Sequence, residues 1–272
     1  METRILNRTE VHLPVVGMGT WNLAPPDTYA PAHVDRKKVV GALKLGIELG
    51  LTHVDTAESY GDGEAELMVG EAIKGVRDRV FLASKVEPAH YGYEGVLKAA
   101  RDSCRRLGTD WIDLYQLHWP STQVPVEETM RAMEHLVDTG TIRFIGVSNF
   151  SVKQLTDAQK AMSMHPIVSN QVKYNILDRD IERDLLPYAL KEEITIIAYS
   201  PFDTGRLFTA SSTKLDGLRK VAREKQASLA QMCLNWLVGK EGVVTIPKAI
   251  QEEHVRDNAA AVTWRLPKGS VE

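Results

Sequence analysis

The chain has little cysteine, no long apolar run and almost no net charge, and each shortage argues against a class of protein. Cys104 and Cys233 are the only two cysteines, and they lie outside any CxxC or metal-ligand spacing. We therefore expect two buried, reduced thiols, with no disulfide framework and no metal site. No apolar run is long enough to span a bilayer, and no apolar signal segment follows Met1. These absences predict a cytoplasmic protein that is not held in a membrane.

The charges nearly balance, since 33 Lys and Arg face 36 Asp and Glu for a net charge of −3. This balance gives no reason to expect nucleic acid or a membrane surface as a partner. A length of 272 residues, 43% of them hydrophobic, is enough to bury a sizeable core. We find no linker, low-complexity segment, strong repeat or heptad pattern. We therefore expect one domain over residues 1–272, acting as a monomer.

What the sequence does contain is a regular alternation of strand and helix patterns. Eight short, almost continuously apolar segments are typical of a parallel sheet covered on both faces, and each precedes a helical pattern. The expected strands are residues 15–20, a segment ending at 55, and 80–86, 112–118, 143–148, 167–172, 194–200 and 243–247. The expected helices are residues 35–49, 64–74, 92–107, 126–138, 152–162, 181–191, helical stretches up to 239, and 254–262.

Eight such units predict a (β/α)8 barrel, the TIM-barrel fold. The alternative is a doubly wound open sheet, but no GxGxxG fingerprint follows the first strand. Residues 3–13 precede the barrel pattern and resemble two short strands around a turn at Asn7 and Arg8. We expect this N-terminal β-hairpin to cap the barrel.

Three consecutive expected strands each end in an ionisable residue. Asp55, Lys85 and His118 occupy these ends, and Tyr60 lies in the loop just beyond the first of them. In barrels of this kind the chemistry takes place at the carboxyl ends of the strands. We therefore expect these four side chains to converge at one mouth of the barrel.

Together, the four residues suit the protonation of a carbonyl oxygen. An aspartate beside a buried lysine forms an ion pair that lets both stay charged. The ammonium should lower the pKa of a neighbouring tyrosine, which can then give a proton to a developing alkoxide. A neutral histidine can donate a hydrogen bond to the same oxygen. Taken singly, each residue is better explained as a salt bridge, a packed core histidine or a loop aromatic, so the prediction depends on their joint placement.

With these residues placed, the chain resembles the aldo-keto reductase superfamily over nearly its whole length. The matching motifs are residues 17–21, 55–57 with Tyr60, 63–64 with 69–70, 84–85, 117–120, 145–150, 170–171, 198–201 and 246–248. The resemblance implies reduction of small aldehydes and ketones to alcohols, with a hydride from a nicotinamide cofactor as the attacking group. It implies that Tyr60 is the general acid, that Lys85 lowers its pKa, that Asp55 pairs with Lys85 and that His118 orients the carbonyl.

The resemblance also implies a set of cofactor-binding residues. Ser148, Asn149 and Gln171 match the residues that bind the carboxamide, and Tyr199 matches the aromatic that stacks on the nicotinamide. On the sequence alone, Ser148 and Asn149 would be a strand-to-helix cap and Tyr199 a core aromatic. The remaining implied contacts are Gly19, Thr20, Trp21, Asp55, Ser200, Pro201, Phe202, which replaces a more usual leucine, Gly205, Lys248, Ala249, His254, Asp257 and Asn258.

The adenosine end departs from the family pattern. Lys248 matches the lysine that binds the 2′-phosphate of NADPH, and Asn258 matches the residue that meets adenine. Ala249 and His254 replace a frequent serine and a frequent arginine, and Asp257 replaces a common glutamate. Losing a guanidinium removes a strong phosphate contact. We expect NADPH to be the cofactor, with measurable use of NADH.

Trp21, Tyr60, His118 and Trp119 should line an apolar, aromatic substrate mouth. The loop after His118 is short, and the chain ends soon after the last expected helix. This pattern predicts an open pocket for small aldehydes and ketoaldehydes.

Two other functions use the same residues. A lyase or aldolase would form a Schiff base on Lys85, which needs an uncharged lysine, and Asp55 argues against that. A redox-sensing accessory subunit would hold NADPH with little turnover, as some members of the superfamily do. The presence of all four catalytic residues argues against this second alternative.

Overall fold

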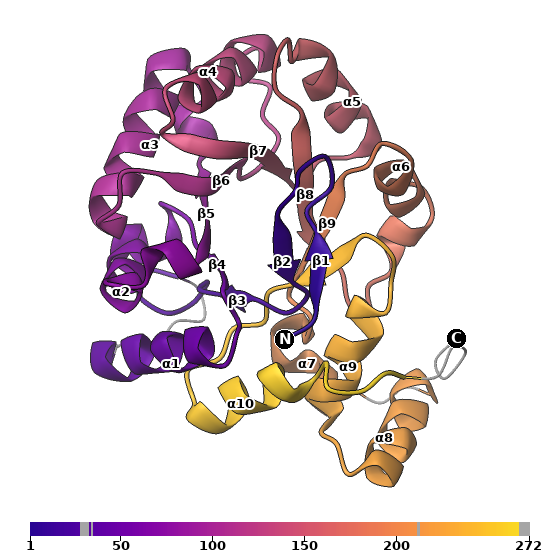
Figure 1. Cartoon of the computed structure of the whole chain (residues 1–272). Helices are drawn as coiled ribbons and strands as arrows, with labels where there is room; N and C mark the ends of the chain where they lie inside the picture. Colours follow the sequence, from indigo (N-terminus) through magenta and orange to yellow (C-terminus); the bar gives the residue numbers. More distant parts are fainter. Residues whose placement is uncertain (28–32, 34, 211–212, 267–272) are drawn as a thin grey trace.

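The centre of the molecule is a sheet of eight parallel strands, seen in a computed structural model that describes residues 1–27, 33, 35–210 and 213–266. Each strand pairs with the next one along the chain, so the order in space follows the order in sequence (Figure 1). The strands are β3 (Met18–Gly19), β4 (His53–Asp55), β5 (Phe81–Val86), β6 (Ile112–Leu117), β7 (Ile142–Ser148), β8 (Ile167–Lys173), β9 (Thr195–Tyr199) and β10 (Val243–Thr245).

The sheet closes on itself at a seam between its first and last strands. Val16, just before β3, forms a parallel bridge with Thr245 of β10. The Gly17 N–H donates to the Thr245 carbonyl at 2.8 Å, and the Thr245 N–H donates to the Val15 carbonyl at 2.9 Å. On its other side, residue 17 lies close to His53, the first residue of β4. A β-carbon at position 17 would lie 2.5 Å from the His53 carbonyl oxygen, so this position requires glycine. The predicted (β/α)8 barrel is confirmed, and the doubly wound alternative is wrong.

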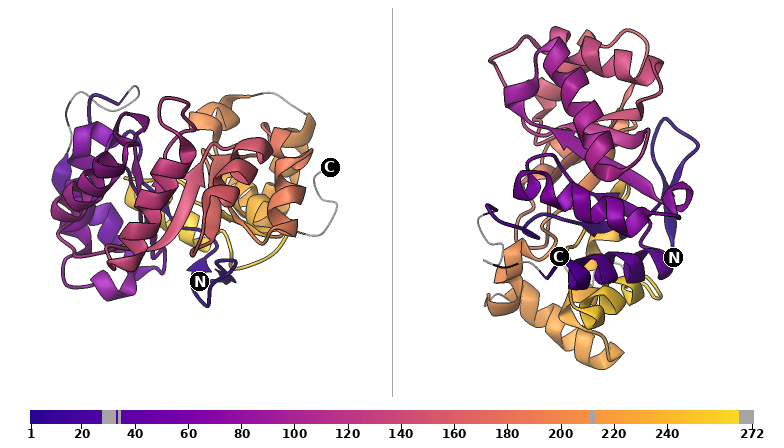
Figure 2. Two further views of the ribbon diagram at one scale, coloured as in Figure 1. Left: turned by 90° about the horizontal axis from the view of Figure 1, so that it is seen from above. Right: turned by 90° about the vertical axis from the view of Figure 1, so that its left-hand side faces the viewer.

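Helices surround the barrel on its outside (Figures 1 and 2). They are α1 (Arg36–Glu48), α2 (Glu64–Ile73), α3 (Tyr93–Leu107), α4 (Val126–Asp138), α5 (Val152–Ala161), α6 (Leu185–Lys191), α7 (Arg206–Thr209), α8 (Thr213–Lys225), α9 (Leu229–Val238) and α10 (Glu252–Ala260). Asp35 caps α1 and a left-handed Gly108 ends α3. Within the described ranges no helix is both long enough and apolar enough to cross a membrane. Cys104 and Cys233 are both buried, as predicted.

The N-terminal hairpin consists of β1 (Thr3–Ile5) and β2 (His12–Pro14), paired antiparallel. Leu6 and Leu13 are fully buried in a cluster with side chains from the inside of the barrel. The Asn7 N–H donates at 3.0 Å to the hydroxyl of Thr195, the first residue of β9. The hairpin therefore closes the amino end of the barrel, as predicted, and leaves the carboxyl ends of the strands open for a site.

Two helix predictions are corrected by the structure. Residues 181–191 are not one helix but a 3-10 turn, Asp180–Glu182, followed by the seven-residue helix α6. Pro187 explains the late start, because proline has no N–H and fits only in the first turn of a helix. The last helix, α10, begins at Glu252, two residues before the predicted start.

Candidate active site

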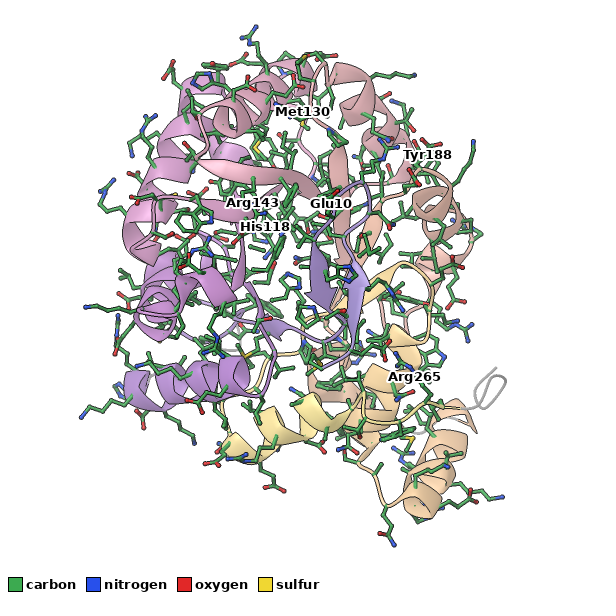
Figure 3. All side chains as sticks on the ribbon, viewed as in Figure 1. Glu10, His118, Met130, Arg143, Tyr188 and Arg265 are labelled. Carbon is green, nitrogen blue, oxygen red and sulfur yellow. The ribbon has the colours of Figure 1, made fainter. Side chains whose placement is uncertain are left out.

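The four residues predicted for catalysis meet at the carboxyl ends of three neighbouring strands. Asp55 is the last residue of β4, Lys85 is the last but one of β5, and His118 follows the last residue of β6. Figure 3 labels His118 within the ring of strands. Tyr60 begins the 3-10 turn after β4, in which the next three residues, 61–63, all have positive φ angles. This sharp turn brings the Tyr60 phenol back over the end of β5.

Lys85 is the centre of a buried network. Its Nζ lies 2.5 Å from Oδ1 of Asp55, donates to the Thr56 carbonyl at 2.9 Å and donates to the Tyr60 hydroxyl at 3.1 Å. Both side chains of the ion pair are almost completely buried, at 0% and 2% exposure. Burial lowers the pKa of Lys85, but the charge and hydrogen bonds of Asp55 and Tyr60 raise it more, so the pKa lies above its ordinary value. The ammonium therefore stays charged, which argues against a Schiff-base role.

The Tyr60 phenol corrects one expectation. Lys85 lowers its pKa, as predicted, but burial raises it by more, and the net result is a pKa of about 12. The prediction that the pKa would fall below its ordinary value is therefore wrong for the protein without a bound cofactor. The phenol is fully protonated at neutral pH, which suits a proton donor.

The second oxygen of Asp55 is also fully used. Oδ2 accepts from Nε2 of Gln171 at 2.7 Å and from Nε2 of Gln116 at 3.3 Å. Gln171 is a predicted carboxamide contact, and here its amide nitrogen is engaged within the barrel. Gln116 was not predicted, because it lies inside β6 and carries none of the strand-end signals. The amides fix the carboxylate so that its other oxygen faces Lys85.

His118 stands beside the phenol. Its ring packs edge-on against the Tyr60 ring, with centroids 5.6 Å apart and planes at 73°. Nδ1 contacts the carboxylate of Glu87, and the Ser59 hydroxyl lies 3.5 Å from the same nitrogen. Glu87 was not predicted, although it directly follows β5 and could have been found by the rule that placed Lys85.

A cavity of about 970 Å³ opens over these residues. The predicted residues that line it are Gly19, Thr20, Trp21, Asp55, Tyr60, His118, Trp119, Ser148, Asn149, Gln171, Tyr199, Ser200, Pro201, Phe202, Gly205 and Lys248. Lys85 lies beneath its floor. Ten further lining residues were not predicted: Asn22, Asp27, Ser59, Glu87, Lys173, Asp203, Thr204, Arg206, Phe208 and Ile246. Lys173 is the last residue of β8, and the other nine lie in the segments that follow β3, β4, β5, β9 and β10, so proximity to strand ends was the available signal.

One wall of the cavity is a chain of hydrogen bonds across the ends of β7, β8 and β9. The Tyr199 hydroxyl donates to Oδ1 of Asn149 at 2.9 Å, and Nδ2 of Asn149 donates to the Ser148 hydroxyl at 3.0 Å. The Ser148 hydroxyl donates in turn to the backbone carbonyl of Gln171 at 2.9 Å. These bonds fix the orientation of the Tyr199 ring and offer polar atoms beside it. A flat ring that carries an amide would fit such a wall.

The other end of the cavity carries cations. Lys173 and Arg206 both pair with Asp203, at 2.9 Å and 3.3 Å. Lys248 has no carboxylate within ion-pair distance among the described residues, and burial lowers its pKa. An ammonium on an exposed side chain that pairs with no described carboxylate is suited to bind an anion such as a phosphate.

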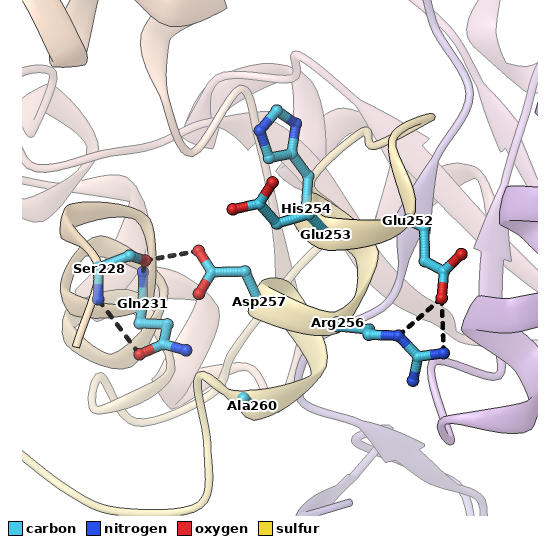
Figure 4. A pocket seen from close by; sticks show the side chains of 8 residues that line it. All are labelled: Ser228, Gln231, Glu252, Glu253, His254, Arg256, Asp257 and Ala260. Carbon is cyan, nitrogen blue, oxygen red and sulfur yellow. Dashed lines mark hydrogen bonds and ion pairs between the residues drawn. The ribbon is translucent and has the colours of Figure 1, made fainter. Parts of the chain in front are cut away.

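Apart from Lys248, the residues predicted for the adenosine end lie outside this cavity. His254 and Asp257 line a separate hollow beside α10, which we call the α10 hollow (Figure 4). The Ser228 hydroxyl donates to Asp257 at 2.5 Å, and Arg256 is paired with Glu252 on the same helix. The set lining the hollow is Ser228, Gln231, Glu252, Glu253, His254, Arg256, Asp257 and Ala260. Ala249 and Asn258 line neither cavity among the described residues, and Asn258 is buried.

Comparison with known proteins agrees with this geometry. The model of the Aldo/keto reductase family matches residues 15–272. Methylglyoxal reductase YeaE of Escherichia coli K12 is 41% identical over 257 residues, which cover 94% of this chain and 88% of that protein.

Two solved structures extend the likeness to the whole fold. The thermostable aldo-keto reductase Tm1743, solved with the inhibitor epalrestat, is 41% identical with a TM-score of 0.92, covering 99% of this chain and 97% of that one. An aldo/keto reductase from Klebsiella pneumoniae, solved with NADP and acetate, is 39% identical with a TM-score of 0.85, covering 96% and 90%. The chain belongs to the aldo/keto reductase family.

Proposed function

We propose that this enzyme reduces small, uncharged aldehydes and ketoaldehydes to alcohols with NADPH, and that Tyr60 is the proton donor. The observation that carries the proposal is a buried series of hydrogen bonds from Asp55 through Lys85 to the Tyr60 hydroxyl. It ends at a large cavity. The similarity to a methylglyoxal reductase supports the substrate class, and the similarity to an NADP-bound reductase supports the cofactor.

The chemistry that the residues can perform is a proton transfer. When bound, the reduced nicotinamide supplies a hydride to the carbonyl carbon. The Tyr60 hydroxyl gives its proton to the carbonyl oxygen, which completes the alcohol and leaves a phenolate. The Lys85 ammonium, 3.1 Å from that oxygen, stabilises the phenolate as it forms, and Asp55 keeps the ammonium charged.

The cofactor fits the residues of the cavity at both ends. Ser148, Asn149 and Gln171 offer hydroxyl and amide groups for the carboxamide beside the Tyr199 ring. Lys248 offers a phosphate a cation that pairs with no carboxylate in the described part of the chain. Because Ala249 and His254 stand where the family often has serine and arginine, we also propose measurable use of NADH. Steady-state kinetics with both cofactors should give a ratio of kcat/KM below about a thousandfold; a larger ratio would contradict dual use.

The substrate side of the cavity explains the preference for uncharged compounds. Trp21 and Trp119 are 36% and 46% exposed and supply apolar walls. Asp27 and Glu87 are carboxylates that line this cavity, whereas the lysines and the arginine among the described lining residues belong to the cofactor side. The imidazole of His118, which stacks on Trp119, is a further ionisable group beside this wall. Asp27 and Glu87 would repel a carboxylate-bearing carbonyl compound.

The first test compares the wild type with Tyr60→Phe. The rate of NADPH oxidation with a reactive small aldehyde should fall by a factor of about 10² or more, the usual size of general acid catalysis. Tyr188→Phe is the matched control, because its hydroxyl lies outside the barrel and bonds Thr156 and Gln159. Activity that survives in Tyr60→Phe would refute the proton donor. No activity in the wild type, with NADPH tightly bound, would instead favour the accessory-subunit function.

All the residues with proposed catalytic roles belong to one chain and one barrel. That the chain works as a single-domain monomer in the cytoplasm stays a prediction.

A further inference from the structure

The contact between His118 and Glu87 decides how the histidine can serve the reaction. The Glu87 carboxylate contacts Nδ1, and the side chains are 27% and 10% exposed for Glu87 and His118. Ser59 offers its hydroxyl to the same side of the ring at 3.5 Å. The two ring nitrogens lie on different edges of an imidazole, so Nε2 is the nitrogen left for the cavity that His118 lines.

The carboxylate fixes which nitrogen carries the proton. Burial raises the pKa of Glu87, but the hydrogen bond and charge of His118 lower it more, and the net pKa is below its ordinary value. Glu87 is therefore ionised at neutral pH and can only accept a hydrogen bond. Nδ1 must then carry the hydrogen of the bond that joins the two side chains. In a neutral imidazole only one nitrogen is protonated, so Nε2 is left as an acceptor.

We propose that Glu87 is a positioning residue that holds the proton of neutral His118 on Nδ1, so that His118 donates to the substrate carbonyl only as an imidazolium. This inference deepens the proposed function and rests on it. It differs from the expectation that a neutral histidine orients the carbonyl. The carbonyl oxygen would then meet a charged donor at Nε2, which forms a stronger hydrogen bond than a neutral one.

The charges around the ring allow this state. With His118 protonated, the cations His118 and Lys85 face the carboxylates Glu87 and Asp55, so the four charges balance. Three other titratable groups lie nearby, and their hydrogen bonds and ring contacts are not with the ring nitrogens of His118. They are Tyr60, packed edge-on against the ring, Glu58, which accepts from the Glu87 N–H and contacts His90, and Tyr91, whose hydroxyl bonds the Trp119 backbone.

The direct test is the tautomer of His118. Long-range ¹H–¹⁵N spectra of histidine-labelled protein, assigned by the signals lost in His118→Asn, should show a neutral form protonated on Nδ1. In Glu87→Gln the amide can donate to Nδ1, so the neutral form should change to the Nε2-protonated tautomer. Asp27→Asn is the control: it removes another carboxylate from the cavity wall, but one that accepts from the N–H groups of Asn22 and Gly61. Its His118 signals should match those of the wild type.

A wild-type neutral form protonated on Nε2 would overturn the proposal without any variant. An unchanged tautomer in Glu87→Gln would overturn the role of Glu87.

The kinetic test compares the reaction rate with the protonation of His118, both measured over the same range of pH. With an uncharged aldehyde and NADPH, the wild-type kcat/KM should fall as His118 loses its imidazolium proton in the spectra. Glu87→Gln should lack this fall and give a plateau about tenfold lower, because its donor is neutral. A wild-type rate that stays constant through the titration would overturn the proposal. If no aldehyde is reduced at all, the proposed function fails, while the spectra still report the tautomer.

Discussion

The floor of the active site and the α10 hollow both contain ion pairs, but the pairs differ in what surrounds them. Lys85 and Asp55 lie at the floor of the cavity, and both side chains are almost completely shielded from solvent. Arg256 and Glu252 are 55% and 69% exposed and pair along one helix surface. A buried pair is lost only at a high free-energy cost, whereas an exposed pair contributes little and is easily replaced. The contrast implies that the buried floor tolerates little change, while the α10 hollow, where the sequence predicts adenosine contacts, can be altered by surface substitutions.

The largest expected effect comes from breaking the buried pair. Lys85→Met leaves the Asp55 carboxylate buried without its cation, and the free energy of unfolding should fall by about 3–5 kcal/mol. Arg256→Met, the matched change in the α10 hollow, should alter it by less than about 0.5 kcal/mol. Urea denaturation measures both. The double variant Lys85→Met/Asp55→Asn should recover part of the loss. Equal losses in Lys85→Met and Arg256→Met would refute the contrast.

The next effect concerns Lys248, the cation at the cofactor end of the main cavity. Lys248→Met should raise the KM for NADPH by about 10- to 100-fold, the range expected for losing a hydrogen bond to a charged group. The KM for NADH should change by less than about threefold, because that cofactor has no 2′-phosphate. Equal increases for the two cofactors would show that Lys248 does not contact the 2′-phosphate.

A smaller effect should appear in alkaline solution. Between pH 10 and 12 the unfolded chain releases the Tyr60 proton while the folded chain keeps it, because the folded pKa is about 12. The folded state is therefore progressively destabilised as pH rises above 10. From pH 9 to pH 11 the wild type should lose about 1 kcal/mol more unfolding free energy than Tyr60→Phe. Parallel urea denaturation at the two pH values measures this difference, and identical losses would show that the phenol is not buried as described.

The smallest effect is a gain. His254 is exposed in the α10 hollow, and His254→Arg should increase the preference for NADPH over NADH by about fivefold, a size typical of an exposed charge contact. The ratio of kcat/KM for the two cofactors is the measurement. The thermal midpoint should stay within about 1 °C, since the substitution leaves the buried floor unchanged. No change in the ratio would place the 2′-phosphate away from α10.

The sequence predicted the barrel and the convergence of Asp55, Lys85, Tyr60 and His118 because both follow from periodicity. Strand ends can be read from apolar segments, and parallel strands bring their carboxyl ends together. Gln116 could not be found in this way, because the partner of a polar side chain inside a strand depends on the register of the neighbouring strands. The prediction of one helix over residues 181–191 does not allow for Pro187, which can stand only near the start of a helix.

The pKa of Tyr60 illustrates a second limit. The sequence places a cation near the phenol and so indicates a lowered pKa, but the net shift depends on how much water reaches the oxygen. Burial is a property of the packed loops, and here it outweighs the lysine. Likewise, the charge of Glu87 can be read from the sequence, but its contact with Nδ1 rather than Nε2 of His118 depends on the orientation of one ring.

The seam between Val16 and Thr245 also has a consequence for biosynthesis. Asp55, Lys85 and His118 leave the ribosome long before the strand that completes the ring, because β10 is the last strand to be made. Until residue 245 emerges, the backbone groups of residues 15–17 have no strand to pair with on that side, and such an edge can pair with other chains. Nascent chains that stall before this point should therefore require chaperone protection, and the cofactor cavity can form only near the end of synthesis.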